Sequence, residues 1–355
     1  MEAIALLLND IHVDKDNISE FDKNWDEALS ICRQNGICDI VVGGDMFTSR
    51  SSQTLATLLA VRHALDRAVS QDIDVTIAEG NHDLVAQEEV EGYNHLFTGL
   101  KGVGIVDTHR AMYWEDCDFC LLVMSYFPEE GTFLERLEKA VTDTMRRYTQ
   151  IKGRGQIMLY IHEGVHGALG DFDIPGELPQ EPLMDFMGVL CGHYHNRARI
   201  KGTKIEYIGS SRQHNFGEDE EKGYTVLYDN GERQFVKNKA NTRYATIEIN
   251  ASDMETLEDN IREKIRDGYK TRVRVKCDER EAKTFDKKKL VEMGFNKVEV
   301  VSAQPAGIEI TDSEICEKYD RMGIRKEYQS FCADRGIDAE LGMKYLDKTE
   351  RPCGN

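Results

Sequence analysis

The apolar run Ile4-Ala5-Leu6-Leu7-Leu8 is followed directly by Asn9-Asp10-Ile11-His12. A membrane helix needs roughly 20 apolar residues and a signal peptide needs a basic flank. The run has neither, so it predicts a short buried β-strand. In an open α/β sheet, ligands bind beyond the carboxyl ends of the strands. Asp10 and His12 therefore stand where functional side chains are expected.

Four more short motifs stand at or just beyond the end of an apolar run. They are Gly44-Asp45, Gly80-Asn81-His82-Asp83, His162 and Gly192-His193-Tyr194-His195. A single histidine at a strand end is more often a core or surface residue, but five such motifs in one chain favour a common site. Five strands are thus expected to deliver these side chains to one edge of the fold.

The residue types are those of a mixed carboxylate and imidazole metal site. Without a thiolate, such ligands suit Mn²⁺, Fe or Zn²⁺ better than a soft, thiophilic metal. Two divalent ions are expected, with Mn²⁺ as the first choice and Mg²⁺, Fe or Zn²⁺ as alternatives. Two cations about 3.5 to 4 Å apart need a bridging ligand. Asp45 is the expected bridge, because Gly43 and Gly44 let the backbone approach closely. His193 and His195 could each reach a different metal.

Residues 1–240 alternate apolar runs with amphipathic stretches, as an α/β domain does. Helices are predicted at 21–34 and 52–70, and the second is expected to bury a face made of Leu55, Leu58, Leu59, Leu65 and Val69. Strands are predicted at 4–9, 40–42, 75–78, 121–124, 157–161, 189–191, 205–208, 224–228 and 234–236.

A second, smaller α/β unit is predicted at 241–303. Its expected elements are strands at 244–249, 271–277 and 297–301 and helices at 253–266 and 285–293. The remainder, 304–355, is predicted to form a tail of short helices. The chain thus divides into a large domain, a small module and a tail.

The charge balance is acidic, with 45 Lys plus Arg against 64 Asp plus Glu and a formal net charge of −19. Residues 1–240 carry 23 basic and 40 acidic residues, a net charge of −17, whereas 241–303 has a net charge of +1. Nucleic-acid binders usually present a basic surface. The acidity therefore argues against a chain that binds DNA tightly without a partner. It does not argue against a chain that cleaves DNA together with a partner.

Nine cysteines, an odd number, suggest free thiols in a reducing, cytoplasmic compartment. Cys117 and Cys120 form a C-x-x-C, but no second cysteine pair lies nearby to complete a zinc site. With no membrane segment predicted, no membrane partner is expected.

The five motifs resemble those of the calcineurin-like metallophosphoesterase family, whose pattern is D-x-H, GD, GNH-D/E, H and GHxH in that order. The resemblance implies a four-layer α-β-β-α sandwich, with 241–303 as a capping domain. It also implies one metal bound by Asp10, His12, Asp45 and His195, and another bound by Asp45, Asn81, His162 and His193. His82 matches the family's catalytic histidine, which is not a metal ligand.

Within that family the sequence is similar to SbcD-type DNA repair nucleases and their phage relatives, counterparts of the eukaryotic meiotic recombination nuclease. The similarity is carried by Gly44-Asp45-Met46-Phe47, Tyr207-Ile208-Gly209-Ser210-Ser211, Phe216-Gly217-Glu218 and Glu221-Lys222-Gly223-Tyr224. It implies an intracellular exonuclease or endonuclease of DNA repair or recombination, with a phage-encoded protein as one option.

The same resemblance implies DNA as substrate, a coiled-coil ATPase of the SbcC type as partner, and a homodimer as an option. The ATPase would dock on the tail, where Tyr319, Met322, Ile324, Tyr328 and Phe331 could form an apolar face. These residues could equally pack on their own domain.

Two positions depart from the subfamily pattern. Thr48 stands where many of these nucleases carry a histidine, three residues after the bridging aspartate, and Asn9 replaces the usual glycine. Threonine cannot supply the same proton transfer. Exonuclease or endonuclease preference and polarity therefore stay open.

The mechanism implied is hydrolysis of a phosphodiester by a metal-activated hydroxide. His82 would protonate the leaving oxygen, with Asp83 orienting a nearby group. Arg212 and His214 are expected to contact the substrate phosphate, and Arg212 is the better candidate because a guanidinium forms charge-assisted bonds.

Two other functions compete with a DNA nuclease. The first is a small-molecule phosphodiesterase or phosphomonoesterase on the same metal core, with which the acidic charge balance agrees more easily. The second is a non-catalytic subunit of an assembly, which is disfavoured because every metal-ligand position is filled. Residues 270–276, Lys-Thr-Arg-Val-Arg-Val-Lys, place basic residues along one side of a strand. That side could face DNA or simply be solvated.

Overall fold

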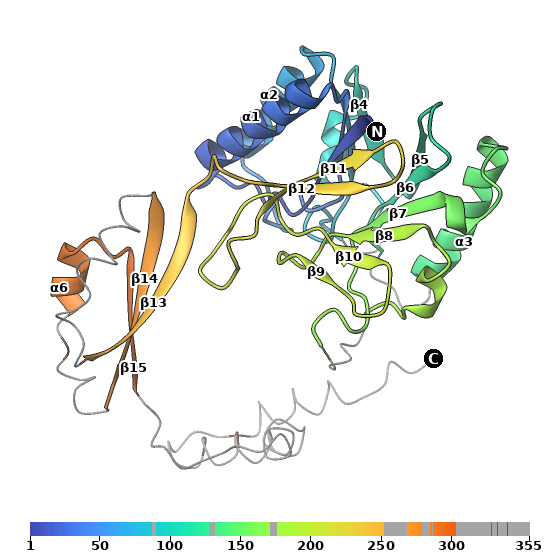
Figure 1. Cartoon of the computed structure of the whole chain (residues 1–355). Coiled ribbons are helices and arrows are strands. Elements are labelled where there is room, and N and C mark those ends of the chain that lie inside the picture. The colour runs from blue at the N-terminus through green and yellow to red at the C-terminus, as the bar shows by residue number, and fades with distance from the viewer. Residues whose placement is uncertain are drawn as a thin grey trace. The chain divides into compact units, whose positions relative to one another are not determined.

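The structure is a computed structural model of the chain (Figure 1). It describes residues 1–86, 90–127, 132–170, 176–251, 268–278, 285, 287–302, 328, 332 and 339. The chain divides into two compact units, Met1–Val275 with Asp286–Glu299, and Lys276–Phe285 with Val300–Asn355. Nearly all of the second unit lies outside the described residues.

The first unit holds two six-stranded sheets. One has the order β12-β11-β1-β2-β3-β4, in which β1 to β4 run parallel and β11 and β12 are antiparallel additions. Its strands are β1 (Ala3–Leu8), β2 (Asp39–Val42), β3 (Asp74–Ala78), β4 (Val103–Val106), β11 (Gly223–Tyr228) and β12 (Arg233–Lys237).

The other sheet has the order β5-β6-β7-β8-β10-β9, with β6, β7, β8 and β10 parallel and an antiparallel strand at each edge. Its strands are β5 (His109–Tyr113), β6 (Cys120–Met124), β7 (Ile157–Ile161), β8 (Gly188–Cys191), β9 (Ala198–Arg199) and β10 (Ile205–Tyr207). Short 3₁₀ turns span Tyr93–Phe97, Arg154–Gln156 and Glu181–Leu183.

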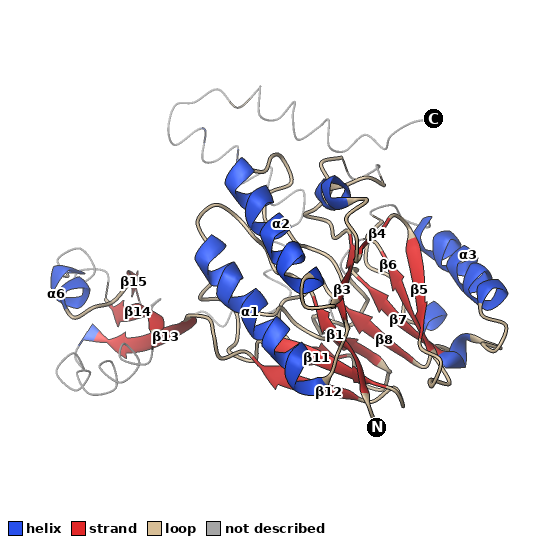
Figure 2. Cartoon of the chain, turned by 90° about the horizontal axis from the view of Figure 1, so that it is seen from above, coloured by secondary structure: helices blue, strands red, loops and turns tan. Residues whose placement is uncertain are grey.

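Alternation along the strands builds the layers, because successive side chains point to opposite faces of a sheet. In β1, Leu6 and Leu8 pack under the helices α1 (Ile18–Asn35) and α2 (Leu55–Val69), while Ala5 and Leu7 face the second sheet. In β6, Leu122 packs under α3 (Thr132–Arg147), and Leu121 joins the core between the sheets. Figure 2 shows α1 and α2 on one side and α3 on the other. The predicted four-layer α-β-β-α sandwich is confirmed.

The predicted strands and the first two helices are confirmed within about three residues at each end. The elements β4, β5, β9 and α3 were not among those predicted. The helix α1 ends where expected, at Gly36, which adopts a left-handed φ of 69° and donates its N–H to the Cys32 carbonyl.

The predicted buried face of α2 is correct only in part, because Leu65 is buried and Leu58 packs against the core, but two of its other leucines are exposed. Leu55 is 70% exposed and Leu59 is 44% exposed. Besides Leu65, the helix buries smaller residues, which are Thr57, Ala60, Val61, Ala64 and Ala68. Small side chains let α1 approach closely, so that the Trp25 indole donates to the Ala64 carbonyl at 2.8 Å.

The small module contains a three-stranded sheet of order β13-β14-β15. The strands are β13 (Arg243–Asn250), β14 (Tyr269–Cys277) and β15 (Lys297–Ser302), and a short helix, α6, spans Lys287–Glu292. These elements agree with the predicted strands and the second predicted helix. The predicted helix at 253–266 and nearly all of the tail lie outside the described residues.

The described part of the chain contains seven cysteines. In the large domain, the described thiols of Cys32, Cys38, Cys117, Cys120 and Cys191 are not in disulfides, and burial raises the pKa of the Cys120 thiol to about 12. None of the described helices combines the length and apolar character that crossing a bilayer requires.

Candidate metal centre

The loops that follow five strands converge on one site at the carboxyl edges of the two sheets. Polar residues follow β1, β2, β3, β7 and β8, so the predicted convergence holds for the side chains Asp10, His12, Asp45, Asn81, His82, His162, His193 and His195. Each of these strands is apolar and is followed by a polar loop, and the five loops together form one cluster of polar side chains.

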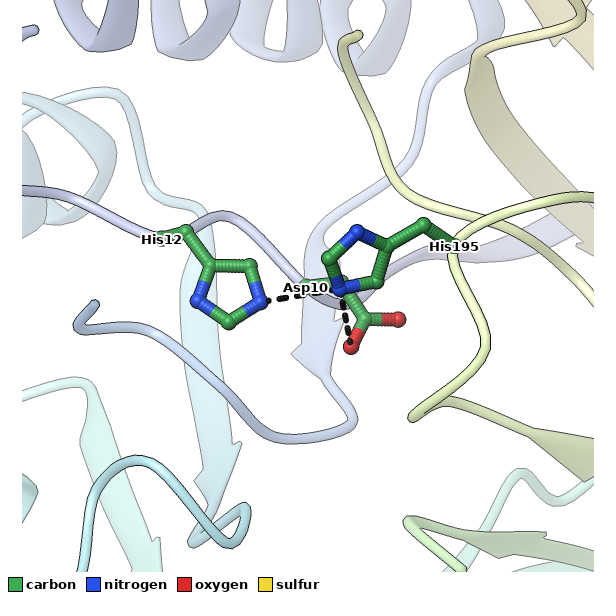
Figure 3. A group of neighbouring side chains, drawn as sticks. All are labelled: Asp10, His12 and His195. Carbon is green, nitrogen blue, oxygen red and sulfur yellow. Dashed lines mark hydrogen bonds and ion pairs between the residues drawn. The ribbon is translucent and has the colours of Figure 1, made fainter. Parts of the chain in front are cut away.

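One group of convergent ligand atoms belongs to Asp10, His12 and His195, whose donor atoms lie within 4.8 Å of one another. Figure 3 shows the two imidazoles turned toward each other above the carboxylate. Nε2 of His12 lies 3.1 Å from Nε2 of His195, and the latter lies 3.9 Å from Oδ1 of Asp10. These atoms could share one cation.

A second group consists of Asp10, Asp45 and His162. Nε2 of His162 lies 3.3 Å from Oδ2 of Asp45 and 3.8 Å from Oδ1 of Asp10. Oδ2 of Asp45 is also 3.5 Å from Nε2 of His12, so it lies close to both groups. Both carboxylates are thus placed between two potential cations, where the sequence singled out only Asp45.

Asn81 and His193 lie beside these groups. Nδ1 of His193 is 3.2 Å from Oδ1 of Asn81, and the His193 ring centroid is 5.7 Å from that of His162. The backbone N–H of His193 lies 3.2 Å from the Asp10 carboxylate. His193 is in neither group of convergent atoms, so its assignment as a ligand stays a prediction.

The donor set fits a divalent cation. Nδ1 of His162 lies 3.0 Å from the Gly43 carbonyl and donates its N–H there, which leaves Nε2 with its lone pair, buried and without a hydrogen bond. An unsatisfied buried polar atom is costly. A cation between the carboxylates would take this nitrogen as a ligand and remove that cost.

The electrostatics support the same fit. Burial lowers the pKa of His162, but the carboxylates of Asp45 and Asp10 outweigh it and raise the pKa to about 10. Burial likewise raises the pKa of Asp45, but His162 and His12 hold it far below its usual range. The buried carboxylates therefore demand a nearby positive charge, which a bound cation could provide instead of an imidazolium.

Backbone strain is concentrated at the site. Asp10, His12, Asp45 and His193 have φ angles of 50°, 51°, 54° and 88°, in the left-handed region that side chains other than glycine seldom adopt. Among the described non-glycine residues, only Asp72 shares this conformation. Such strain persists where the surrounding structure holds it in place, and it clusters at functional sites.

Gly44 makes a close approach that a side chain would prevent. Its φ is 117°, and an added Cβ would lie 2.4 Å from Nδ1 of His162. We expect Gly44→Ala to weaken divalent-metal binding and to lower the free energy of unfolding by about 2 to 5 kcal/mol, because it combines a disfavoured φ with overpacking. Denaturant unfolding and metal titration would measure both effects.

The control for that variant is Gly36→Ala. Gly36 also has a positive φ, 69°, but no atom lies within 4 Å of the added Cβ. The expected cost is only about 1 to 2 kcal/mol, with metal binding unchanged. Equal losses for the two variants would contradict the role given to the contact with His162.

Asp83 holds two loops together rather than facing the cluster. Its buried carboxylate accepts backbone N–H groups from Met46 at 3.2 Å, Phe47 at 2.9 Å and Gly80 at 2.8 Å. Burial, with Glu79 nearby, raises its pKa well above the usual range. These contacts give Asp83 a positioning role for the loop that carries Asp45, and its assignment to the catalytic residues stays a prediction.

His82 lies beside the cluster and is held from two sides. Its backbone N–H donates to Oδ1 of Asp45 at 2.8 Å, and its Nδ1 lies 2.6 Å from the Thr48 carbonyl, to which it donates. Its other nitrogen, Nε2, is then the one available for chemistry. His82 and Thr48 line a cavity of about 450 Å³, together with His12 and His195.

Arg212 and His214 line the same cavity, but they bind the backbone of the β1 loop. Nη2 of Arg212 donates to the carbonyls of Ile11 at 3.2 Å and His12 at 3.1 Å. Nε2 of His214 lies 2.8 Å from the Asp10 carbonyl. Burial and the Arg212 charge lower the pKa of His214 well below its usual range. Both residues stabilise the strained loop, and their assignment as substrate-binding residues stays a prediction.

Asn9 and Tyr160 are contributors that the sequence did not identify. The Asn9 amide donates to the Asp10 carboxylate and to the Gly209 carbonyl. The Tyr160 hydroxyl, from β7, donates to the Leu8 carbonyl at 2.7 Å and lies 2.9 Å from Oδ1 of Asn9. The asparagine at position 9, where the subfamily usually has glycine, was the sequence feature that could have indicated a role for Asn9. Asn9 links the two sheets directly behind Asp10.

No protein-family model and no curated protein matches the sequence. Among solved structures, the chain is similar to the nuclease MPE of Pseudomonas putida, with 17% identity and a TM-score of 0.27. That match covers 56% of this chain and 65% of that one, so it spans less than two thirds of the nuclease.

The chain is also similar to a dimetal phosphatase from Danio rerio, with 12% identity, a TM-score of 0.36, and coverage of 58% of this chain and 86% of that one. Both likenesses are too distant to assign an activity. That assignment rests on the geometry of the site.

Proposed function

We propose that the chain is a two-metal-dependent phosphodiesterase that hydrolyses DNA, as an exonuclease or endonuclease in repair or recombination, with Mn²⁺ as its metal. The observation that carries the proposal is the pair of ligand groups that share Asp10, with the lone pair of His162 buried and unsatisfied between carboxylates. The carboxylate ligands suit Mn²⁺, whereas the imidazoles also suit Fe or Zn²⁺.

Two bound cations would supply Lewis acidity toward the phosphate oxygens and toward an attacking water. The protein's own groups have separate tasks. Asp10, Asp45, His12, His162 and His195 hold the positive charge in place. His82, which belongs to neither ligand group, is free to give a proton to the leaving oxygen through Nε2.

The cavity offers limited support for DNA as the substrate. It is lined by Tyr244 and Lys270 as well as by the site residues, and an aromatic ring beside a cation suits a nucleotide. On the basic side of β14, Arg272 and Arg274 share the carboxylate of Glu299 at 3.5 Å and 3.0 Å, which offsets part of their charge. Weak charge attraction from the chain itself fits the proposed need for a partner.

A small-molecule phosphodiesterase or phosphomonoesterase is the second candidate. Asp14, Asp16 and Glu20 line the same cavity, and carboxylates there would repel a long polyanion more than a small ester.

A direct assay separates the two functions. Labelled duplex DNA, single-stranded DNA and a chromogenic phosphodiester are incubated with Mn²⁺, and with a chelator as control. We expect Mn²⁺-dependent cleavage of DNA. Hydrolysis of the small ester alone would support the second candidate, and no hydrolysis of any substrate by the metal-loaded protein would refute both.

We also propose that residues 304–355 dock a coiled-coil ATPase of the SbcC type. The support is the resemblance in motifs and domain order. Pull-down of such an ATPase by the full chain, but not by residues 1–303, is expected. Equal capture by both would refute a docking role for the tail.

A further inference from the structure

His195 is oriented by a carboxylate at its far nitrogen. Its Nδ1 lies 2.9 Å from Oε1 of Glu218, so the N–H on Nδ1 donates to that carboxylate. The lone pair of Nε2 is then left for the site, where it lies 3.1 Å from Nε2 of His12 and 3.9 Å from Oδ1 of Asp10. The contact selects the tautomer that can bind a metal.

Glu218 is itself firmly held. Its side chain is only 8% exposed, and Oε2 accepts the backbone N–H of His214 at 3.1 Å. The Asn215 amide donates to Oε1 at 2.9 Å. Because several donors fix this carboxylate, it cannot move with the imidazole. Rotation of the His195 ring would therefore break their hydrogen bond, so the contact restrains the ring.

Lys222 neutralises this carboxylate and holds the histidine as well. Its Nζ lies 3.5 Å from Oε2 of Glu218, and its side chain is 3% exposed. The same ammonium donates to the His195 carbonyl at 2.5 Å and to Oδ1 of Asn196 at 2.8 Å. Glu218 therefore fixes the ring of His195, while Lys222 fixes its backbone.

The other imidazoles of the two ligand groups lack such a partner. Nδ1 of His162 meets the neutral carbonyl of Gly43, and Nδ1 of His12 is buried without a hydrogen bond. His195 is also the more exposed ligand, at 29% of its side chain against 7% for His12. Packing therefore restrains the His195 side chain less than the His12 side chain, and the hydrogen bond to Glu218 provides the additional restraint.

The segment that carries Glu218 is also tied to β13. The side-chain amide of Gln213 donates to the carbonyls of Glu218 at 2.8 Å and Tyr244 at 3.0 Å, and it accepts the Tyr244 N–H at 2.8 Å. One amide thus links the backbone of Glu218 to a strand of the small module.

We propose that Glu218, with Lys222 as its counter-ion, is a positioning residue that sets the tautomer and orientation of His195 for metal binding. The inference rests on the proposed function, since it assumes that His195 is a ligand. The proposed arrangement is a carboxylate that orients a metal-binding histidine, and the five sequence motifs do not include this carboxylate.

The test is Mn²⁺ titration by calorimetry of the full chain and its Glu218→Ala and Glu218→Gln variants. We expect Glu218→Ala to weaken one of two Mn²⁺ sites about 10- to 100-fold. Glu218→Gln should fall between Ala and the native residue, because its carbonyl still accepts the N–H but carries no charge. The visible absorption of bound Co²⁺ should change in the same order.

The matched control is Glu221→Ala. Glu221 lies on the same segment, but its side chain is 58% exposed and pairs with Lys237 at 2.6 Å, so binding and spectrum should stay as in the native chain. Native affinity and spectrum in either Glu218 variant, as judged on chains folded by circular dichroism, would overturn the inference. Absence of divalent-metal binding by the native chain would instead overturn the proposed function.

Discussion

Asp45→Asn is expected to remove binding at both metal positions and to lower turnover about a thousandfold. Oδ2 of Asp45 lies 3.3 Å from Nε2 of His162 and 3.5 Å from Nε2 of His12. An amide NH₂ in its place would bring a donor and no charge to the point where both cations need an anionic oxygen. Losing several kcal/mol of charge stabilisation corresponds to roughly three orders of magnitude in rate.

The fold should survive that substitution. Asparagine tolerates the left-handed φ that Asp45 adopts, and its Oδ1 can still accept the His82 N–H. Asp72→Asn is the control, because Asp72 has a φ of 57° in an exposed turn. Metal content by atomic emission and kcat on the cleaved substrate are the measurements. Retention of one full site would remove the bridging role.

His82→Asn is expected to keep both metals and to lose about 10²- to 10⁴-fold in kcat, the usual contribution of a positioned general acid. His82 belongs to neither ligand group, and the backbone N–H that it gives to Asp45 remains in the variant. The loss should fall on kcat more than on KM, because the proton is transferred in the transition state.

The control for His82 is His63→Asn, which changes an exposed histidine on α2. It should leave metal content and kcat unaffected. Near-normal turnover of His82→Asn, with both metals bound, would exclude a catalytic role for His82.

Several strands could be predicted from the sequence because their signals are local. Runs such as Ile157–Ile161 are wholly buried, and the next residue, His162, is polar. The strands β4 and β5 escaped prediction because most of their residues are only partly buried and several are polar or glycine. The helix α3 has its buried residues Phe133, Leu137, Ala140, Val141 and Thr144 at helical spacing, so its pattern could have been recognised.

Hydrophobicity alone misassigned part of the buried face of α2, since Leu55 and Leu59 are exposed. Five large apolar residues outweighed the alanines in the sequence pattern, yet the alanines are buried. The deciding factor is the neighbour, since Trp25 of α1 fills the space that small residues leave and bonds to the Ala64 carbonyl. A helix's own sequence does not record the shape of its partner.

The sequence by itself determined that carboxylates and imidazoles follow five strands, and therefore that they meet at one edge of the sandwich. Only the tertiary structure decided what each of them contacts. Asp83 reaches Met46 across 37 residues, His214 reaches Asp10 across 204, and Glu218 reaches His195 across 23. A strand end is set by local chemistry, whereas a hydrogen bond depends on where two separate loops lie once both sheets have packed.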